Sequence, residues 1–287
     1  MSGQGSALPP AAPPEAPPGR AVGPGRWGDG LFVAGLSSLL GSYIVLIVGL
    51  LFALGIFTSP AHVLAAIDTE EIRYALRLSL ISCTLTTLLS LWVAVPAGYV
   101  LSRFPFWGRN LVDAVLDIPI VLPPLVMGLA LLVLFQTRLG RAIDQVVPVT
   151  FSVPSVVLAQ FPVACAFAVR TMRVTFDQIS PRAERVALTL GCSRSQAFWM
   201  VALPEARRGV LTAAMLAWAR SLGEFGPILV FSGATRMRTE VLPTTVFLEL
   251  SIGNIESAAA VSLMMVATAL VVLILARMFG LRGTGLL

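Results

Sequence analysis

The stretch RAERVALTLGCSRSQAFWMVALPEARRG, Arg182 to Gly209, mixes charged residues with residues that start and end helices, although long apolar runs lie on both sides of it. Pro181 suits the first position of a helix, where a missing backbone N–H does no harm. Gly191 is typical of a helix end, and Pro204 disfavours helical geometry in the residue before it. We therefore predict two short helices that form an elbow over residues 181–204.

Capping residues and apolar periodicity support both helices. Ser180 can cap the first helix, and Ser193 with Gln196 has the spacing of a capping box for the second. The predicted apolar faces are Ala183, Val186, Ala187 and Leu190 in the first helix and Phe198, Val201 and Ala202 in the second. We expect these faces to rest on the ends of membrane spans and the tip, Gly191–Arg194, to face the cytoplasm. The residues alone fit equally well a helix pair that lies among lipid headgroups.

The whole chain has the composition of an integral membrane protein. Of its 287 residues, 56% are hydrophobic and 12% are charged, and the mean hydropathy is +0.86. A soluble domain carries about 25% charged residues. Residues 1–30, rich in Pro, Gly and Ala, predict a disordered cytoplasmic tail. Residues 31–287 predict an all-α transmembrane domain.

Six apolar runs are long enough to cross a bilayer, which takes about 20 residues of helix. The predicted spans are about 31–57, 74–102, 113–137, 154–173, 207–233 and 257–279. Apart from Arg220, 13 arginines lie in the segments and span ends that are cytoplasmic if the N-terminus is inside, against six in the external segments and span ends. This bias predicts a cell (inner) membrane protein with both termini and the elbow in the cytoplasm. The pI near 9.8 follows from these loops, so we expect no nucleic-acid partner.

All 20 basic residues are arginine. Without lysine the chain cannot form a phosphate-binding P-loop or a Schiff base, so any ATP must be hydrolysed by another chain. The single histidine, His62, cannot build a metal site alone, and Cys83 and Cys165 lie in apolar runs typical of buried thiols. We therefore predict no enzymatic activity, no metal and no cofactor in this chain.

Charge and helix-breaking residues coincide in the fifth predicted span. Arg220 lies about 18 Å along that span, where a charge is costly unless it is paired or hydrated, and Glu224 is one turn further on. Pro227 is expected to kink or break the helix. An ion pair that only stabilises the helix would explain the two charges. A pathway role is compatible with that pair, and we expect Ser221–Pro227 to form part of an outer gate.

Prolines also punctuate the third predicted span. Near the start of a helix they can simply set its geometry; the alternative is that Leu122–Gly128 lines a pathway opposite the fifth span. The candidate pathway and gate residues are Arg220, Ser221, Gly223, Glu224, Phe225 and Gly226 in the fifth span and Pro123, Pro124 and Gly128 in the third.

The elbow resembles the coupling loop of ATP-binding-cassette (ABC) importer permeases, whose signature is an E-A-A-like triplet, a Gly and a closing I-x-L-P. Here Arg185-Val186-Ala187, Gly191 and Val201–Pro204 have the same spacing, with Arg185 where Glu is usual and Glu184 one residue earlier. The stretches GRNLVDAVLDIPIVLPPLVMGLALL (108–132) and WARSLGEFGPILVFSG (218–233) extend the resemblance over the membrane part. It is closest to molybdate, tungstate and sulfate permeases.

The resemblance implies a type I importer fold with six transmembrane helices and a cytoplasmic coupling elbow. The implied partners are a second permease chain, expected to be a copy of this one, two cytoplasmic ATPase subunits, an external substrate-binding protein and the lipid bilayer. The residues implied to couple to the ATPase are Glu184, Arg185, Ala187, Gly191, Cys192, Ser193, Arg194, Leu203 and Pro204.

The implied substrate is a tetrahedral oxyanion. The alternatives are a permease of the same superfamily for iron, phosphate or a polyamine, a membrane-embedded enzyme, and an ATP-independent secondary transporter. An enzyme would need a catalytic constellation in the spans, such as paired carboxylates or Ser with His, but the spans offer one glutamate, Glu224, and no histidine. A secondary transporter would not require the elbow.

Overall fold

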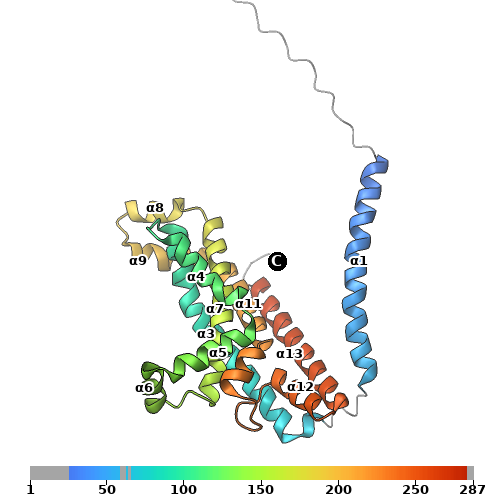
Figure 1. Cartoon of the computed structure of the whole chain (residues 1–287). Helices are drawn as coiled ribbons and strands as arrows, with labels where there is room; N and C mark the ends of the chain where they lie inside the picture. The colour runs from blue at the N-terminus through green and yellow to red at the C-terminus, as the bar shows by residue number, and fades with distance from the viewer. Residues whose placement is uncertain (1–25, 59–62, 64–65, 283–287) are drawn as a thin grey trace, which may run out of the picture. The chain divides into compact units, whose positions relative to one another are not determined.

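The computed structural model describes residues 26–58, 63 and 66–282, and these residues form helices joined by short loops, without a strand. Most of the predicted tail, residues 1–25, lies outside the described residues. The α-helices are α1 (Arg26–Phe57), α3 (Glu70–Arg103), α4 (Arg109–Val121), α5 (Pro124–Gln136), α6 (Arg138–Val146), α7 (Val153–Gln178), α8 (Arg182–Thr189), α9 (Arg194–Ala197), α10 (Leu203–Glu205), α11 (Arg207–Leu222), α12 (Leu242–Ser251) and α13 (Ile255–Arg282) (Figure 1). Two short π-helices, η1 (Phe198–Ala202) and η2 (Ile228–Ser232), complete the set. The predicted all-α architecture is confirmed.

The chain divides into two compact units, residues 1–53 and 54–287, and each is described by itself. The first unit consists of most of α1, which contains the predicted span 31–57. Its large side chains, such as Leu31 and Phe52, are exposed along the helix. Such a helix is suited to an apolar environment, since an apolar stretch of this length matches the thickness of a bilayer.

Four helical segments in the described residues are long and apolar enough to cross a membrane, or five if one bent pair is counted as a span. The four are Gly30–Phe57, Glu70–Arg103, Val153–Gln178 and Ile255–Leu275. The sequence predicts six spans, and the structure interrupts two of them, the third and the fifth.

The predicted third span, 113–137, is the bent pair, because α4 and α5 meet at an angle of 110°. Pro123 and Pro124 explain the bend. Each proline lacks an N–H and pushes the residue before it out of helical geometry. Leu122 and Pro123 accordingly adopt extended backbone angles, with ψ of 138° and 135°.

The predicted fifth span, 207–233, is interrupted where the sequence predicts a break. Helix α11 ends at Leu222, and η2 begins only at Ile228. We call residues Ser221–Pro227 the break segment. Pro227 has no N–H to donate and would clash with the carbonyl of Gly223 in a continuous helix.

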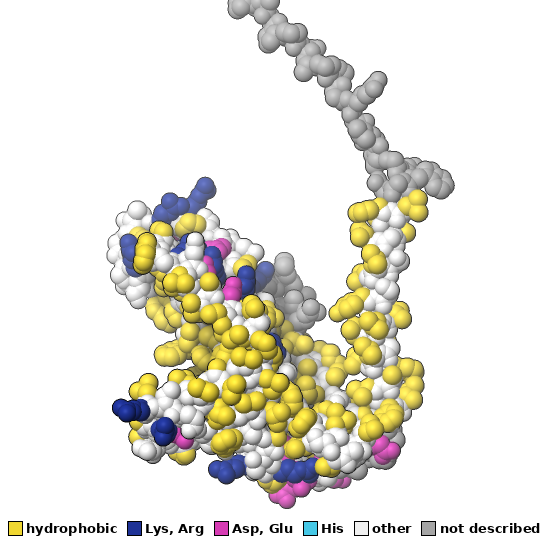
Figure 2. Space-filling view, in the orientation of Figure 1, with side chains coloured by type: hydrophobic (Ala, Val, Ile, Leu, Met, Phe, Trp, Pro, Cys, Tyr) yellow, Lys and Arg dark blue, Asp and Glu magenta, His cyan; other side chains and the backbone are white. Residues whose placement is uncertain are grey.

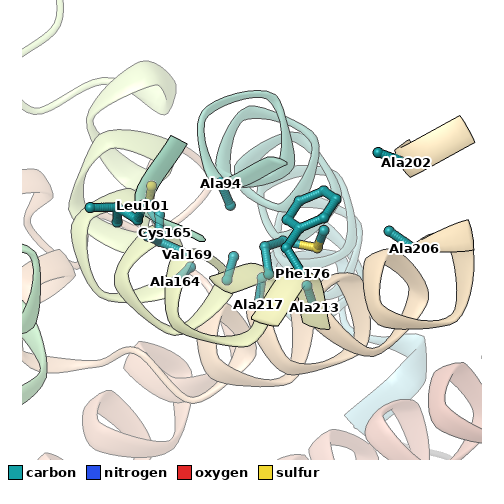
Figure 3. Close-up of a cluster of buried hydrophobic side chains, with 12 residues drawn as sticks. Ala94, Leu101, Ala164, Cys165, Val169, Phe176, Ala202, Ala206, Ala213 and Ala217 are labelled. Atoms are coloured by element: carbon teal, nitrogen blue, oxygen red, sulfur yellow. The ribbon is translucent and has the colours of Figure 1, made fainter. Parts of the chain in front are cut away.

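Helices α3, α7 and α11 pack against one another and form the core of the second unit. Their contact is lined with alanines, among them Ala94, Ala164, Ala213 and Ala217, while Phe176 fills the space near the end of α7 (Figure 3). Small side chains let helix backbones approach closely, which is how helices associate in lipid. The core is therefore a frame of two long helices and the shorter α11.

Charge is distributed unevenly over the second unit. In Figure 2, basic and acidic side chains gather at the end that carries α8 and α9 and at the end that carries α6 and α12, with a largely hydrophobic zone between them. An apolar zone between two charged ends is the pattern expected of a chain that spans a bilayer.

Candidate functional site

The elbow begins with helix α8, which ends as predicted at Gly191. Gly191 has a φ of 92°, in the left-handed region that glycine adopts without strain. The N–H of Cys192 donates to the carbonyl of Ala187 at 3.0 Å, and the N–H of Gly191 donates to Leu188 at 3.1 Å. These two bonds form a Schellman motif, so the first helix is closed by its own backbone.

The second helix starts with the predicted capping box, which is confirmed. The Ser193 hydroxyl accepts from the N–H of Gln196 at 3.2 Å, and the N–H of Ser193 donates to Gln196 Oε1 at 2.8 Å. Two of the N–H groups that a helix start leaves without partners are thereby satisfied.

The prediction that Pro204 ends the second helix is wrong. Helix α9 continues through η1 into α10, and Leu203 keeps helical backbone angles. The N–H of Leu203 donates to the carbonyl of Phe198, five residues back, as in a π-helix. This wider turn accommodates Pro204, whose ring would clash with the carbonyl of Met200 in a regular α-helix.

The predicted apolar face of α8 is also wrong, except at Ala187. The buried residues of this helix are Glu184 and Ala187, whereas Val186 and Leu190 are 57% and 80% exposed. In the second half of the elbow the prediction fits better, because Ala202 is buried in the core cluster and Phe198 packs against it. Apolar side chains that the elbow leaves exposed are Val186, Leu188, Leu190, Trp199 and Met200.

Glu184 is buried because it anchors the elbow to α3. Its Oε1 accepts from Arg103 Nε at 2.9 Å, and its Oε2 accepts from the Tyr99 hydroxyl at 2.8 Å. Arg103 also donates to the carbonyls of Phe176 at 2.8 Å and Ile179 at 2.9 Å, at the end of α7. One arginine thus joins the ends of α3 and α7 to the first turn of α8. Tyr99 and Arg103 are not among the predicted functional residues, because their only signal in the sequence is their position at the end of a span.

Apart from the buried Ala187, the other predicted coupling residues are exposed or half-buried. Arg185 is exposed, and no ion pair to another described residue holds it. The guanidinium of Arg194 lies 5.6 Å from the centre of the Phe104 ring, a cation–π contact. Ser193 and Pro204 are exposed, and Cys192 and Leu203 are half-buried.

The predicted ion pair in the break segment is present. Arg220 Nη2 lies 2.9 Å from Glu224 Oε1, and the side chain of Glu224 is 1% exposed. Arg220 is 34% exposed, and its guanidinium lies 5.9 Å from the centre of the Phe167 ring. The pair places one buried and one accessible charge beside the end of α11.

The structure brings the two predicted groups of pathway residues together. A Cβ added to Gly226 would lie 2.9 Å from the Cβ of Pro124, and one added to Gly128 would lie 2.8 Å from the Cα of Pro227. Both distances are shorter than van der Waals contact, so the start of α5 touches the break segment through glycines. Gly223 is exposed, and Phe225 has its ring 5.3 Å from that of Phe247.

A cavity of about 630 Å³ lies between α7 and α11. Arg170 and Arg208 line it, together with Glu205 and the hydroxyls of threonines on both helices. Arginine and hydroxyl groups are suitable partners for an anion. In the described part of the chain, no group of three or more His, Cys, Asp or Glu residues could hold a metal ion.

Comparisons with known proteins give a consistent result. The model of the family described as "binding-protein-dependent transport system inner membrane component" matches residues 88–282. A probable molybdenum ABC transporter permease protein of Haloferax volcanii is 35% identical over 90% of this chain and 92% of its own length. A sulfate transport system permease protein of Salmonella typhimurium is 33% identical over 61% of this chain and 65% of its own.

Among solved structures, the fold is similar to that of a chain in the crystal structure of a bacterial alginate ABC transporter in complex with an alginate pentasaccharide-bound periplasmic protein. The TM-score is 0.71 with 18% sequence identity, and the match covers 90% of this chain and 96% of the other. At this identity the likeness concerns the fold.

Proposed function

The chain belongs to the family of inner-membrane components of binding-protein-dependent transport systems, and on this premise we propose that it is the permease subunit of an ATP-driven importer for a tetrahedral oxyanion. The resemblance to ABC importer permeases seen in the sequence is confirmed by the family match and by the relatives. The proposed substrate class rests on the names of those relatives, which refer to molybdenum and sulfate transport. Their names favour molybdate, tungstate or sulfate over iron, phosphate or a polyamine.

We propose that ATP hydrolysis resides in a separate subunit and that the elbow couples to it. The exposed apolar side chains of the elbow, such as Leu190 and Trp199, form a surface that a soluble partner can cover. The tip of the elbow contributes the exposed Arg194 and the half-buried Cys192. Because Glu184 binds Arg103, a force on this surface passes directly to the ends of α3 and α7.

The complete importer, in this proposal, contains two copies of this chain, two ATPase subunits and an external binding protein that delivers the oxyanion. Affinity for the oxyanion belongs to the binding protein, since a pathway that gripped a dianion tightly would not release it. The permease supplies weak, accessible positive charge instead, such as that of Arg220 and of the arginines in the cavity between α7 and α11.

The gate in this proposal is the break segment together with the start of α5. A broken helix exposes backbone dipoles to a cavity, and non-helical backbone inside a membrane occurs where it lines such a space or is buried in protein. The buried Glu224, the accessible Arg220 and the close contact between Gly226 and Pro124 support this location. We further propose that both termini and the elbow are cytoplasmic.

Reconstitution tests the function directly. The chain would be purified with a candidate ATPase and a candidate oxyanion-binding protein from the same genome and inserted into nanodiscs. ATP hydrolysis would then be measured with binding protein loaded with molybdate, tungstate or sulfate, and with phosphate or ferric iron as the competing substrates. We expect stimulation by at least one of the three oxyanions over the empty binding protein. Stimulation only by phosphate or iron would disprove the oxyanion assignment, whereas the permease assignment would stand.

A further inference from the structure

A single polar side chain in the centre of the core connects three helices. Gln160 lies on α7 and is 1% exposed. Its Oε1 accepts from the Thr86 hydroxyl on α3 at 3.0 Å, and its Nε2 donates to Ser82 Oγ on α3 at 3.3 Å. The same nitrogen donates to the backbone carbonyl of Ser221 on α11 at 3.2 Å. Since a carbonyl only accepts, the contact with Ser221 fixes which end of the amide faces α11.

The carbonyl that Gln160 reaches is one that the helix break leaves without a partner in its own helix. Helix α11 ends at Leu222, and the last carbonyls of a helix have no N–H from a following turn. The Ser221 carbonyl accepts instead from the N–H of Glu224 at 3.2 Å and from Gln160. A carbonyl oxygen can accept two hydrogen bonds, so Gln160 adds a second bond to this carbonyl and attaches the end of α11 to α7.

Gln160 is also connected to the elbow through its own helix. Phe176 and Ile179, whose carbonyls bind Arg103, lie at the end of α7, about 24 Å along the helix from Gln160. Helix α7 packs closely on α3 over its length. The elbow and the break segment are thereby attached to the same helix at two points.

We propose that Gln160 is a positioning residue that holds the break segment in register with α7, so that the gate moves only when the elbow moves. The inference rests on the proposed function and deepens it, because it assigns to Gln160 the coupling between hydrolysis and the gate. Nothing in the packing requires an amide at this place, and a buried polar group is costly unless it is partnered. A methionine of similar size would fill the same space without holding the Ser221 carbonyl.

The test is Gln160→Met in the complete importer, reconstituted with its ATPase and binding protein. We expect ATP hydrolysis without binding protein to rise about fivefold, and oxyanion transported per ATP to fall about fivefold. This factor corresponds to the net contribution of one hydrogen bond to an equilibrium. Assembly and the thermal unfolding midpoint should stay close to wild type, since an apolar residue of similar volume replaces a buried polar one.

Gln145→Met is the control, because Gln145 is an exposed amide on α6. It should leave both quantities unchanged. Wild-type coupling in an assembled Gln160→Met importer would overturn the inference, as would a fall in stability without a change in transport per ATP. If Gln160→Met does not assemble, Gln160→Leu decides, because it also lacks the amide that binds the Ser221 carbonyl. Uncoupling in this variant supports the inference, and wild-type coupling overturns it.

The wild-type importer in the same assay separates this inference from the proposed function. If no oxyanion-loaded binding protein stimulates the wild-type chain, the proposed oxyanion function fails and the Gln160 inference falls with it. If the wild type is stimulated and Gln160→Met couples equally well, only the role of Gln160 is refuted.

Discussion

At the residue scale, Glu184 decides whether the elbow stays attached. Glu184→Ala would leave Arg103, itself 12% exposed, without its carboxylate partner. Removing one member of a buried ion pair costs about 3–5 kcal/mol. We expect the thermal unfolding midpoint in detergent to fall and the amount of ATPase that co-purifies with the permease to fall with it.

Arg185 provides the contrast, because it is the neighbouring residue and points to solvent. Arg185→Glu removes no contact within the described part of the chain, so we expect normal expression and an unchanged unfolding midpoint. If the elbow binds the ATPase as proposed, ATP hydrolysis stimulated by the binding protein should change. An equal fall in expression and in stimulated hydrolysis would show that Arg185 has a structural role instead.

A second carboxylate makes stability depend on pH. Glu240, in the loop between η2 and α12, is fully buried, and burial raises its pKa above the ordinary 4.5, although Thr245 and Arg236 partly offset this. The folded chain therefore holds the proton more tightly than the unfolded chain does. This tighter proton binding stabilises the folded state. The stabilisation is complete below about pH 4.5 and is lost as pH rises through the folded-state pKa.

Glu240→Gln removes that dependence. We expect the variant to unfold at a higher temperature than wild type at pH 8, with the difference shrinking as the pH is lowered towards 5. Thermal unfolding across this pH range measures it, with Glu70→Gln as an exposed control. If the unfolding midpoints of wild type and Glu240→Gln change with pH in the same way, Glu240 is not the source of the pH dependence.

At the scale of elements, the contact between α5 and the break segment depends on glycine. Gly226→Ala should separate the two, because the new Cβ would lie 2.9 Å from Pro124. Gly223→Ala is the matched control, since its Cβ would meet no atom closer than 3.8 Å. We expect transport to fall at least tenfold in the first variant and less than twofold in the second, measured as oxyanion uptake. Equal uptake by both variants would refute the proposed gate contact.

The elements also show which features can be predicted from a sequence. The Schellman motif at Gly191, the Ser193 capping box and the break before Pro227 depend on residues a few positions apart, and all three were predictable. The burial of Glu184 was not, because it depends on Arg103, far away in the chain. The periodicity of α8 therefore favoured the wrong face.

The bend between α4 and α5 was predictable only in part. Two prolines indicated a disturbance, but neither the angle of 110° nor the contact of Gly128 with Pro227 follows from their spacing. Gln160 gave no sequence signal, since a single glutamine in an apolar run does not reveal which helix it contacts. Its partners Thr86 and Ser221 lie on two other helices.

At the scale of the whole molecule, the continuous and the broken helices of the second unit have different roles. Helices α3 and α7 are continuous and packed on each other, whereas α4–α5 and α11–η2 are broken and touch each other at their breaks. A continuous, packed helix can transmit a displacement along its length, whereas a break allows the two parts of a helix to move relative to each other. The elbow is attached to the continuous helices through Arg103, and the continuous α7 is attached to the break in α11 through Gln160.

Orientation in the membrane is the property on which this scheme depends, and cysteine labelling tests it. Cys192 lies at the tip of the elbow, while Cys83 and Cys165 are buried and can be replaced by alanine. In that background, a membrane-impermeant maleimide should label Cys192 in inverted vesicles but not in intact cells stripped of their outer layers. Thr235→Cys, with Cys192 replaced by serine, places an exposed thiol in the loop after η2 and should show the opposite pattern. Labelling of Cys192 from outside would show that the topology is the opposite of the proposed one. The elbow could then not reach a cytoplasmic ATPase.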